Sequence, residues 1–127
     1  MKEIIFTEQA TKPTAWYSQA VKVDRQVYLA GVCGDDRNTG AIMGDGDIQI
    51  ETTYALENLK ATIEAAGGRM EDIVKVSVYV KNLQYMQDFN AVYKTYFPEN
   101  PPARIAMEIS NLGGGANLEL DAIAVLA

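Results

Sequence analysis

A run of alternating valines near the middle of the chain constrains the fold more than any other feature of the sequence. The valines occupy every second position: Val74, Val76, Val78 and Val80 alternate with Lys75, Ser77, Tyr79 and Lys81. A period of two places the valines on one face of a β-strand, and valine favours that conformation. The segment therefore predicts a half-buried strand in a sheet with an apolar layer against its valine face.

Two other segments have helical periodicity. In residues 48–66, apolar side chains recur at spacings of three and four, and Gly67-Gly68 follows as a helix-ending signal. A second helix is predicted from about residue 85 to residue 97, and Pro98 stops it. The apolar faces consist of Leu56, Leu59, Ile63 and Ala66 in the first helix and of Met86, Phe89, Tyr93 and Tyr96 in the second.

The other regular segments have the composition of strands. We expect strands at residues 3–6, 16–23, 26–32, 103–109 and 117–126, and a glycine- and aspartate-rich loop at residues 33–47. Two helices and a mixed sheet predict an α+β domain of two layers, with both helices on one face of the sheet. The length of 127 residues predicts a single domain over residues 1–127.

The sheet face without helices is also apolar in this prediction. Along residues 117–126, Leu118 and Leu120 lie on one face of the strand, whereas Ile123 and Val125 lie on the other. Large exposed apolar patches mark association surfaces. We therefore expect a homo-oligomer whose sheet faces pack together, with functional sites at the subunit boundaries.

Two charged residues interrupt the last two apolar strands: Arg104 at residues 103–107, and Glu119 between two leucines. A charge buried alone costs several kcal/mol, so each needs a partner, water or a ligand. An arginine binds a carboxylate through paired hydrogen bonds, and a carboxylate exchanges protons. The pair suits a small anionic substrate that reacts with water. The alternative is a structural salt bridge of Arg104 with Glu119 or Glu108.

Composition excludes or disfavours several other kinds of site. The chain has no histidine, which excludes a Ser-His-Asp triad, a Cys-His dyad and histidine metal ligands. A net charge of −6 disfavours nucleic acid and anionic membranes as partners. No segment resembles a signal peptide or a membrane span, and the single cysteine, Cys33, fits a reducing, cytoplasmic compartment. The GDGD loop at residues 44–47 lacks the other ligands of a calcium loop, so we expect no metal.

Short segments along nearly the whole chain match a known family in order and spacing, although none is specific alone. They are Tyr17–Val21, Ala30-Gly31, Asn38–Gly40, Leu59–Gly67, Val74–Val76, Asn90–Tyr93, Pro102–Arg104 and Leu118–Ala124. Together they resemble the RidA/YjgF family of reactive-intermediate deaminases. The resemblance implies a chorismate-mutase-like fold. It also implies a homotrimer whose three sheets line a central barrel, with clefts between the subunits.

The resemblance further implies an activity, the hydrolysis of 2-aminoacrylate and related enamine and imine acids to 2-keto acids and ammonia, without a cofactor. Arg104 resembles the arginine that binds the substrate carboxylate. Glu119 resembles the carboxylate that positions the attacking water, and the backbone carbonyl of Ala106 matches a position that helps to hold that water.

Three further residues match family positions at the substrate. Tyr17 resembles a tyrosine that closes over the substrate from the neighbouring subunit, and Gly31 and Asn90 match substrate-binding positions. From the residues alone, Tyr17 is equally well an aromatic residue packed on a strand, and Asn90 is an ordinary amide on a helix surface.

Some positions depart from the family pattern. Active members commonly have a serine where this chain has Ala30 and a glutamine where it has Val32, and Ala15-Trp16 replaces a Gly-Pro pair. Loss of the serine hydroxyl removes one hydrogen bond, worth roughly 0.5–1.5 kcal/mol. These differences leave open an alternative, a non-catalytic family member that binds small carboxylates or keto acids.

Two other activities are disfavoured. The acidic neighbours Asp35 and Asp36 are expected to raise the pKa of the Cys33 thiol, which predicts an inert or merely oxidisable cysteine. RNA cleavage has been attached to parts of this family, but the chain lacks a histidine for acid–base chemistry on RNA and has the wrong net charge.

Overall fold

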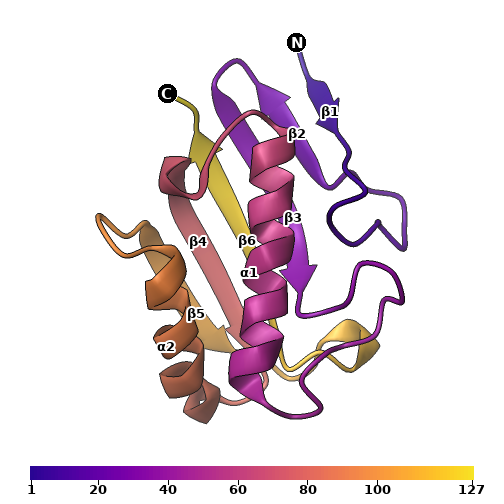
Figure 1. Cartoon of the computed structure of the whole chain (residues 1–127), viewed down its shortest axis with the longest axis vertical. Helices are drawn as coiled ribbons and strands as arrows, with labels where there is room; N and C mark the ends of the chain where they lie inside the picture. The colour runs from indigo at the N-terminus through magenta and orange to yellow at the C-terminus, as the bar shows by residue number, and fades with distance from the viewer.

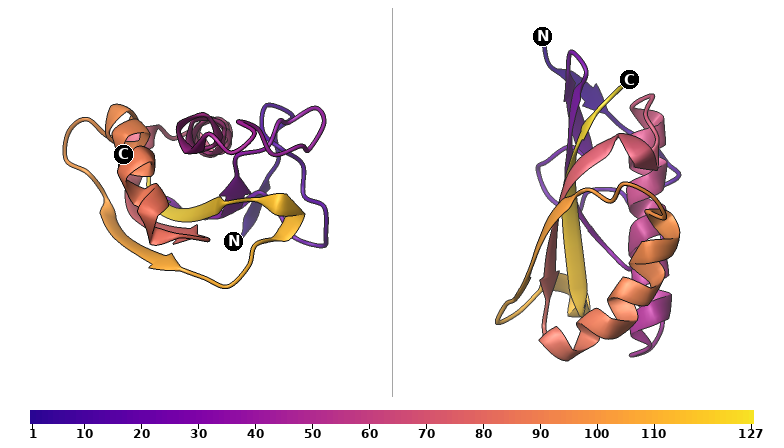
Figure 2. Two further views of the ribbon diagram at one scale, coloured as in Figure 1. Left: turned by 90° about the horizontal axis from the view of Figure 1, so that it is seen from below. Right: turned by 90° about the vertical axis from the view of Figure 1, so that its left-hand side faces the viewer.

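The computed structural model of residues 1–127 has two layers, a mixed β-sheet and a pair of helices (Figure 1). The elements are β1 (Glu3–Ile5), β2 (Ala20–Val23), β3 (Gln26–Cys33), α1 (Ile48–Ala65), β4 (Ile73–Val80), α2 (Met86–Tyr96), β5 (Ala103–Glu108) and β6 (Leu118–Val125). Both helices lie against the same face of the sheet, as Figure 2 shows. The predicted α+β architecture is confirmed. None of the helices combines the length and the apolar character needed to cross a lipid bilayer.

The sheet has six strands in the order β1-β2-β3-β6-β4-β5. Neighbouring strands are antiparallel except β4 and β5, which run parallel because α2 connects them as a crossover. The last strand of the sequence, β6, therefore lies in the middle of the sheet, and β5 forms one edge (Figure 1). The strand with Arg104 and the strand with Glu119 are separated by β4.

Helix α1 covers the middle of the sheet with the apolar face predicted from the sequence. Leu56, Leu59 and Ile63 are fully buried and belong to a single cluster of 22 buried apolar residues. Burial of each such side chain stabilises the fold by about 1.5–3 kcal/mol. Asp47 caps the helix by accepting hydrogen bonds from two backbone N–H groups of the first turn. Gly67, with a φ of 89°, follows the last turn as predicted.

The valine strand differs from the prediction at its first residue. Ile73 is buried and Val74 is exposed, because the pairing of β4 with β6 shifts register between Ile73 and Lys75. This extra residue is a β-bulge, which turns one side chain away from the core. The other three valines of the run are fully buried, as predicted.

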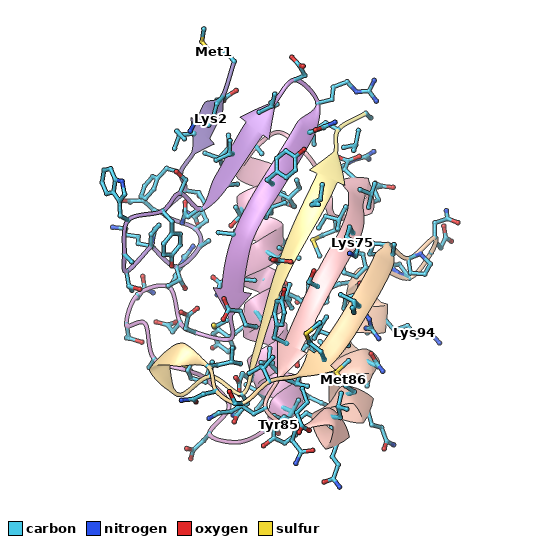
Figure 3. The ribbon with its side chains drawn as sticks, turned by 180° about the vertical axis from the view of Figure 1, so that it is seen from behind. Met1, Lys2, Lys75, Tyr85, Met86 and Lys94 are labelled. Carbon is cyan, nitrogen blue, oxygen red and sulfur yellow. The ribbon has the colours of Figure 1, made fainter.

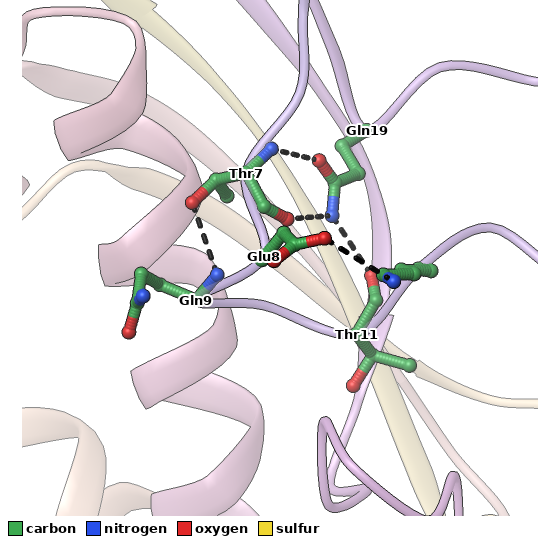
Figure 4. Close-up of polar contacts among 6 residues, drawn as sticks. Thr7, Glu8, Gln9, Thr11 and Gln19 are labelled. Carbon is green, nitrogen blue, oxygen red and sulfur yellow. Dashed lines mark hydrogen bonds and ion pairs between the residues drawn. The ribbon is translucent and has the colours of Figure 1, made fainter.

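The strand predicted at residues 16–23 is wrong in its first half, since β2 begins only at Ala20. The buried side chain of Gln19 explains the difference (Figure 4). Its Oε1 accepts a hydrogen bond from the Thr7 N–H at 2.7 Å, and its Nε2 donates to the carbonyls of Thr7 and Thr11, each at 3.0 Å. These bonds tie the residues before β2 to the N-terminal loop.

The opposite face of the sheet has no helix over it, and Figure 3 shows its side chains from that side. Five large apolar side chains on it are between 37% and 47% exposed: Tyr28, Ile105, Met107, Ile123 and Val125. This is the uncovered apolar face that the strand patterns predict. We refer to it below as the open face.

Candidate active site

A cavity of about 350 Å³ lies where the end of β3 meets the N-terminal loop and the Gly113–Gly115 turn. Its lining includes three residues that were predicted from the sequence, namely Tyr17, Gly31 and Glu119. Ala30 and Val32, two positions that depart from the family pattern, line the cavity as well.

Glu119 reaches this cavity from β6. Its neighbours Leu118 and Leu120 are fully buried under the helices, so the alternation of the strand directs Glu119 to the open face. Burial is the main cause that raises the pKa of Glu119, and the charges of Asp121 and Asp35 act in the same direction. A carboxyl group with a raised pKa can take up and release a proton, as acid–base catalysis requires.

Gly31 provides the space that the Glu119 carboxylate occupies. A Cβ atom at position 31 would overlap Oε2 of Glu119. The φ of Gly31 lies outside the left-handed region that favours glycine. The glycine is therefore required here by space and not by backbone conformation.

Cys33 is the register partner of Glu119 across β3 and β6. Burial, followed by the charges of Glu119 and Asp35, raises the pKa of the Cys33 thiol to about 12. The direction agrees with the prediction, but the main cause is burial, and the contributing carboxylates are Glu119, Asp35 and Glu51.

Arg104 lies on the edge strand β5, and its side chain extends towards α2. Its Nη1 donates a hydrogen bond to Oδ1 of Asn90 at 2.8 Å. The guanidinium carbon lies 4.7 Å from the ring centroid of Tyr93 and 5.9 Å from that of Phe89. The amide that the sequence placed on a helix surface thus contacts the arginine directly.

The alternative of a structural salt bridge for Arg104 is wrong. The ion pairs of the structure join lysines, and one other arginine, to glutamates of their own local segments. Glu108 instead accepts a hydrogen bond from the backbone N–H of Leu83. The guanidinium therefore has no carboxylate partner within the chain and retains free N–H donors.

Arg104 and Glu119 face opposite sides of the sheet. Arg104 pairs with Val76 of β4, whose side chain is buried under the helices, and register partners in a sheet share a face. Glu119 pairs with Tyr79 of β4, which lies on the open face. Ala106 follows Arg104 by two residues and is therefore on the face of Arg104.

The predicted site residues consequently form two separate groups in one chain. The cavity group comprises Tyr17, Gly31 and Glu119, and the edge group comprises Asn90, Arg104 and Ala106. The members of each group lie close to one another, but a single chain does not bring the two groups together.

A polar network beside the cavity was missed by sequence reasoning. Oδ1 of Asp35 accepts hydrogen bonds from the Thr11 hydroxyl at 2.8 Å and from Nδ2 of Asn58 at 3.0 Å. Burial raises the pKa of Asp35, although these hydrogen bonds oppose the shift. The one signal in the sequence that could have revealed this network was Asn58, a polar residue next to Leu59 of the apolar helix face. A larger hollow of about 540 Å³ shares Asp35 and Asn58, but it contains none of the predicted site residues.

The second missed feature fixes the start of β6. Glu51 of α1 is fully buried. Its two carboxylate oxygens accept hydrogen bonds from the backbone N–H and the side-chain amide of Asn117, both at 2.8 Å. Asn117 lies two residues before Glu119, so this contact anchors the strand that carries the cavity carboxylate. A glutamate in the first turn of a helix is common, and nothing in the sequence indicated its partner.

Known proteins resemble this chain over nearly its whole length. The sequence model of the family described as Endoribonuclease L-PSP matches residues 7–126. A RutC family protein of Pyrococcus horikoshii is 46% identical over 124 residues, which cover 98% of each chain. The 2-iminobutanoate/2-iminopropanoate deaminase of Rattus norvegicus is 37% identical over 125 residues, which cover 98% of this chain and 90% of the rat protein.

A solved structure gives the same result at the level of the fold. RidA of an Antarctic Psychrobacter species matches with a TM-score of 0.93 and 34% identity, and the match covers 98% of this chain and 99% of that protein. The resemblance found in the sequence is therefore confirmed, and the chain belongs to the RidA/YjgF family.

Proposed function

We propose that the protein hydrolyses 2-aminoacrylate-type enamine and imine acids to 2-keto acids and ammonia without a cofactor. The observation that carries this proposal is Arg104, whose guanidinium is held by Asn90 and an aromatic ring but has no carboxylate partner in the chain. Such a group recognises the carboxylate of a ligand through paired hydrogen bonds. The rat relative is named as an imine deaminase, which supports the same substrate class.

The reaction requires positioning and proton transfer. The enamine takes up a proton at its terminal carbon and becomes an iminium ion whose C2 is electrophilic. Water adds to C2 while one of its protons passes to Glu119, which then protonates the nitrogen. The C–N bond then breaks as the C2 hydroxyl gives its proton to solvent and the carbonyl forms. This proton replaces the one that the enamine took up from solvent in the first step, so 2-aminoacrylate and water give pyruvate and ammonia. Proximity and general acid–base catalysis supply the acceleration.

We further propose that a complete site combines two copies of the chain within a homotrimer. Arg104 and Glu119 face opposite sides of the sheet and β4 lies between their strands, so one chain cannot place both around one small substrate. The open face supports association, because its apolar side chains remain partly exposed in the single chain. In such a site, Arg104 of one copy binds the carboxylate while Glu119 and Tyr17 of another copy face the reacting carbon.

A coupled assay tests the activity. A pyridoxal-phosphate enzyme releases 2-aminoacrylate from serine, and the formation of pyruvate and ammonia is followed with and without the protein. We expect acceleration over the buffer rate and its near-complete loss in Arg104→Ala. No acceleration, or full activity of Arg104→Ala, would contradict the proposal. A light-scattering mass of one chain would contradict the shared site.

A second candidate is a carboxylate-binding protein without turnover. It is favoured by Ala30 and Val32, which line the cavity and offer no polar side chain to a substrate. In that case a 2-keto acid raises the melting temperature, because it binds only the folded state, while the coupled assay shows no acceleration.

RNA cleavage is the activity in the description of the family model, but two properties of this chain disfavour it. The net charge of −6 repels a phosphate backbone, and no histidine is present for acid–base chemistry. A nuclease activity of the purified protein that Glu119→Gln abolishes would support RNA cleavage after all.

A further inference from the structure

The residues that contact Arg104 all belong to one helix, α2. Phe89 and Tyr93 are four residues apart, so they share a helix face, and their ring centroids are 5.5 Å apart in a stacked arrangement. Asn90 lies beside them and accepts the hydrogen bond from Arg104. The helix thus presents an aromatic surface and one amide oxygen to the edge strand.

The Tyr93 ring makes the closer of the two aromatic contacts with the guanidinium, at 4.7 Å. Arginine stacks on aromatic faces, and such contacts are attractive because the ring face carries partial negative charge. The side chain of arginine loses much rotational freedom when it is fixed. Because the ring already restricts the guanidinium, Arg104 loses less conformational entropy when a carboxylate ligand binds.

The Tyr93 hydroxyl does not account for the presence of a tyrosine at this position. Tyr93 is only 7% exposed, and its hydroxyl is buried without a hydrogen-bond partner. Burial raises the pKa of Tyr93, whereas the charge of Arg104 and the closeness of its N–H groups to the hydroxyl act in the opposite direction, so the phenol remains neutral at neutral pH. The ring makes the defined contact with Arg104, at 4.7 Å, whereas the hydroxyl lies near the guanidinium without a hydrogen bond of good geometry.

We propose that Tyr93 is a positioning residue whose ring holds the Arg104 guanidinium in the orientation that receives the substrate carboxylate. This inference rests on the proposed role of Arg104 as the carboxylate-binding group. It gives the aromatic face of α2 a role in substrate recognition in addition to its role in the hydrophobic core.

A double-mutant cycle tests this inference with Tyr93→Leu, Arg104→Ala and the combined variant. The measurements are KM and kcat in the 2-aminoacrylate assay, and the affinity for a 2-keto acid from the shift in melting temperature. We expect Tyr93→Leu to raise KM roughly 3- to 30-fold, the range that corresponds to a cation–π contact, with little change in kcat. In the Arg104→Ala background the same substitution should add no further loss, because its partner is absent.

Two variants separate positioning from a general structural effect. Tyr93→Phe keeps the ring and should retain the wild-type KM. Tyr96→Leu removes another tyrosine ring from the same helix, one that bonds to Glu57 and has no contact with Arg104, and should also retain it. If Tyr93→Leu unfolds, Tyr93→Met takes its place, since methionine fills a similar volume without an aromatic face.

The outcomes distinguish this inference from the proposed function. If the wild type is active and Arg104→Ala is not, an unchanged KM in Tyr93→Leu overturns the role of the ring alone. An additive effect in the combined variant does the same, as does a loss in Tyr93→Phe equal to that in Tyr93→Leu. If the wild type neither turns over substrate nor binds a keto acid, the proposed function fails, and the inference fails with it.

Discussion

Gly31 and Glu119 lie against each other across β3 and β6, and the carboxylate occupies the space that any side chain at position 31 would need. Because glycine is needed here for space, the smallest possible addition should displace the carboxylate. A single methyl group at position 31 should therefore affect the proton transfer proposed for Glu119.

We expect Gly31→Ala to reduce kcat by about 10²-fold, the lower end of the contribution of a positioned acid–base group. The backbone conformation of Gly31 suits alanine, so the effect should act through Glu119. Steady-state kinetics of Gly31→Ala, Glu119→Gln and the double variant measure this. A double variant that is much slower than Glu119→Gln alone would contradict the explanation.

Glu119→Gln should lower activity and raise stability at the same time. Burial raises the pKa of Glu119 in the folded state. The folded state therefore holds the proton more tightly than the unfolded chain, whose glutamate pKa is about 4.3. The stabilisation from the tighter proton binding at Glu119 is fully present below the unfolded-state pKa and is lost as the pH rises through the folded-state pKa. We expect a kcat loss of about 10²- to 10⁴-fold and a higher melting temperature for the variant near pH 8.

The gain in melting temperature should disappear near pH 4, where the wild-type carboxyl group is protonated and resembles the amide. Melting curves of both proteins at the two pH values provide the control. A melting temperature of Glu119→Gln below that of the wild type near pH 8 would contradict the argument.

Cys33 should resist alkylation in the folded protein. Burial together with the charge of Glu119 raises the pKa of the thiol to about 12, so almost no thiolate exists at pH 8. We expect mass spectrometry after incubation with iodoacetamide to show unmodified native protein. The same protein unfolded in guanidinium chloride should be fully modified, and rapid native modification would show that the thiol is more accessible than the structure indicates.

Asn117→Ala should destabilise the protein strongly, because it leaves one oxygen of the buried Glu51 carboxylate without its partner. An unsatisfied buried polar group costs about 1–3 kcal/mol, and a charged group costs more. Denaturant unfolding measures the loss. Asn38→Ala, on the exposed loop between β3 and α1, is the matched control and should change stability by less than about 0.5 kcal/mol.

The elements of the fold were largely predictable because period and helix-ending signals are local properties of the sequence. Val76, Val78 and Val80 are buried as their alternation requires, and α1 begins and ends close to the predicted residues. The failures occurred where a distant partner decides the local structure. Gln19 hydrogen-bonds to the N-terminal loop, so β2 begins after it and not at residue 16. The pairing of β4 with β6 shifts register next to Val74, which turns that valine away from the core.

The site residues were recognisable as types, but their arrangement was not. The sequence marked Arg104 and Glu119 as charges in apolar strands. It did not show that β4 separates their strands or that the two side chains point to opposite faces. The role of Asn90 depends on a contact between α2 and β5 that no local pattern reveals.

The division of the site into a cavity group and an edge group also has a genetic consequence. Suppose that each cleft takes Arg104 from one copy and Glu119 from another. A chain with Arg104→Ala then still contributes an intact Glu119, and a chain with Glu119→Gln still contributes an intact Arg104. Co-expressed in one cell, two inactive versions of the gene would assemble some clefts from their undamaged halves. Partial complementation between them would then appear, and a site contained within one chain would give none.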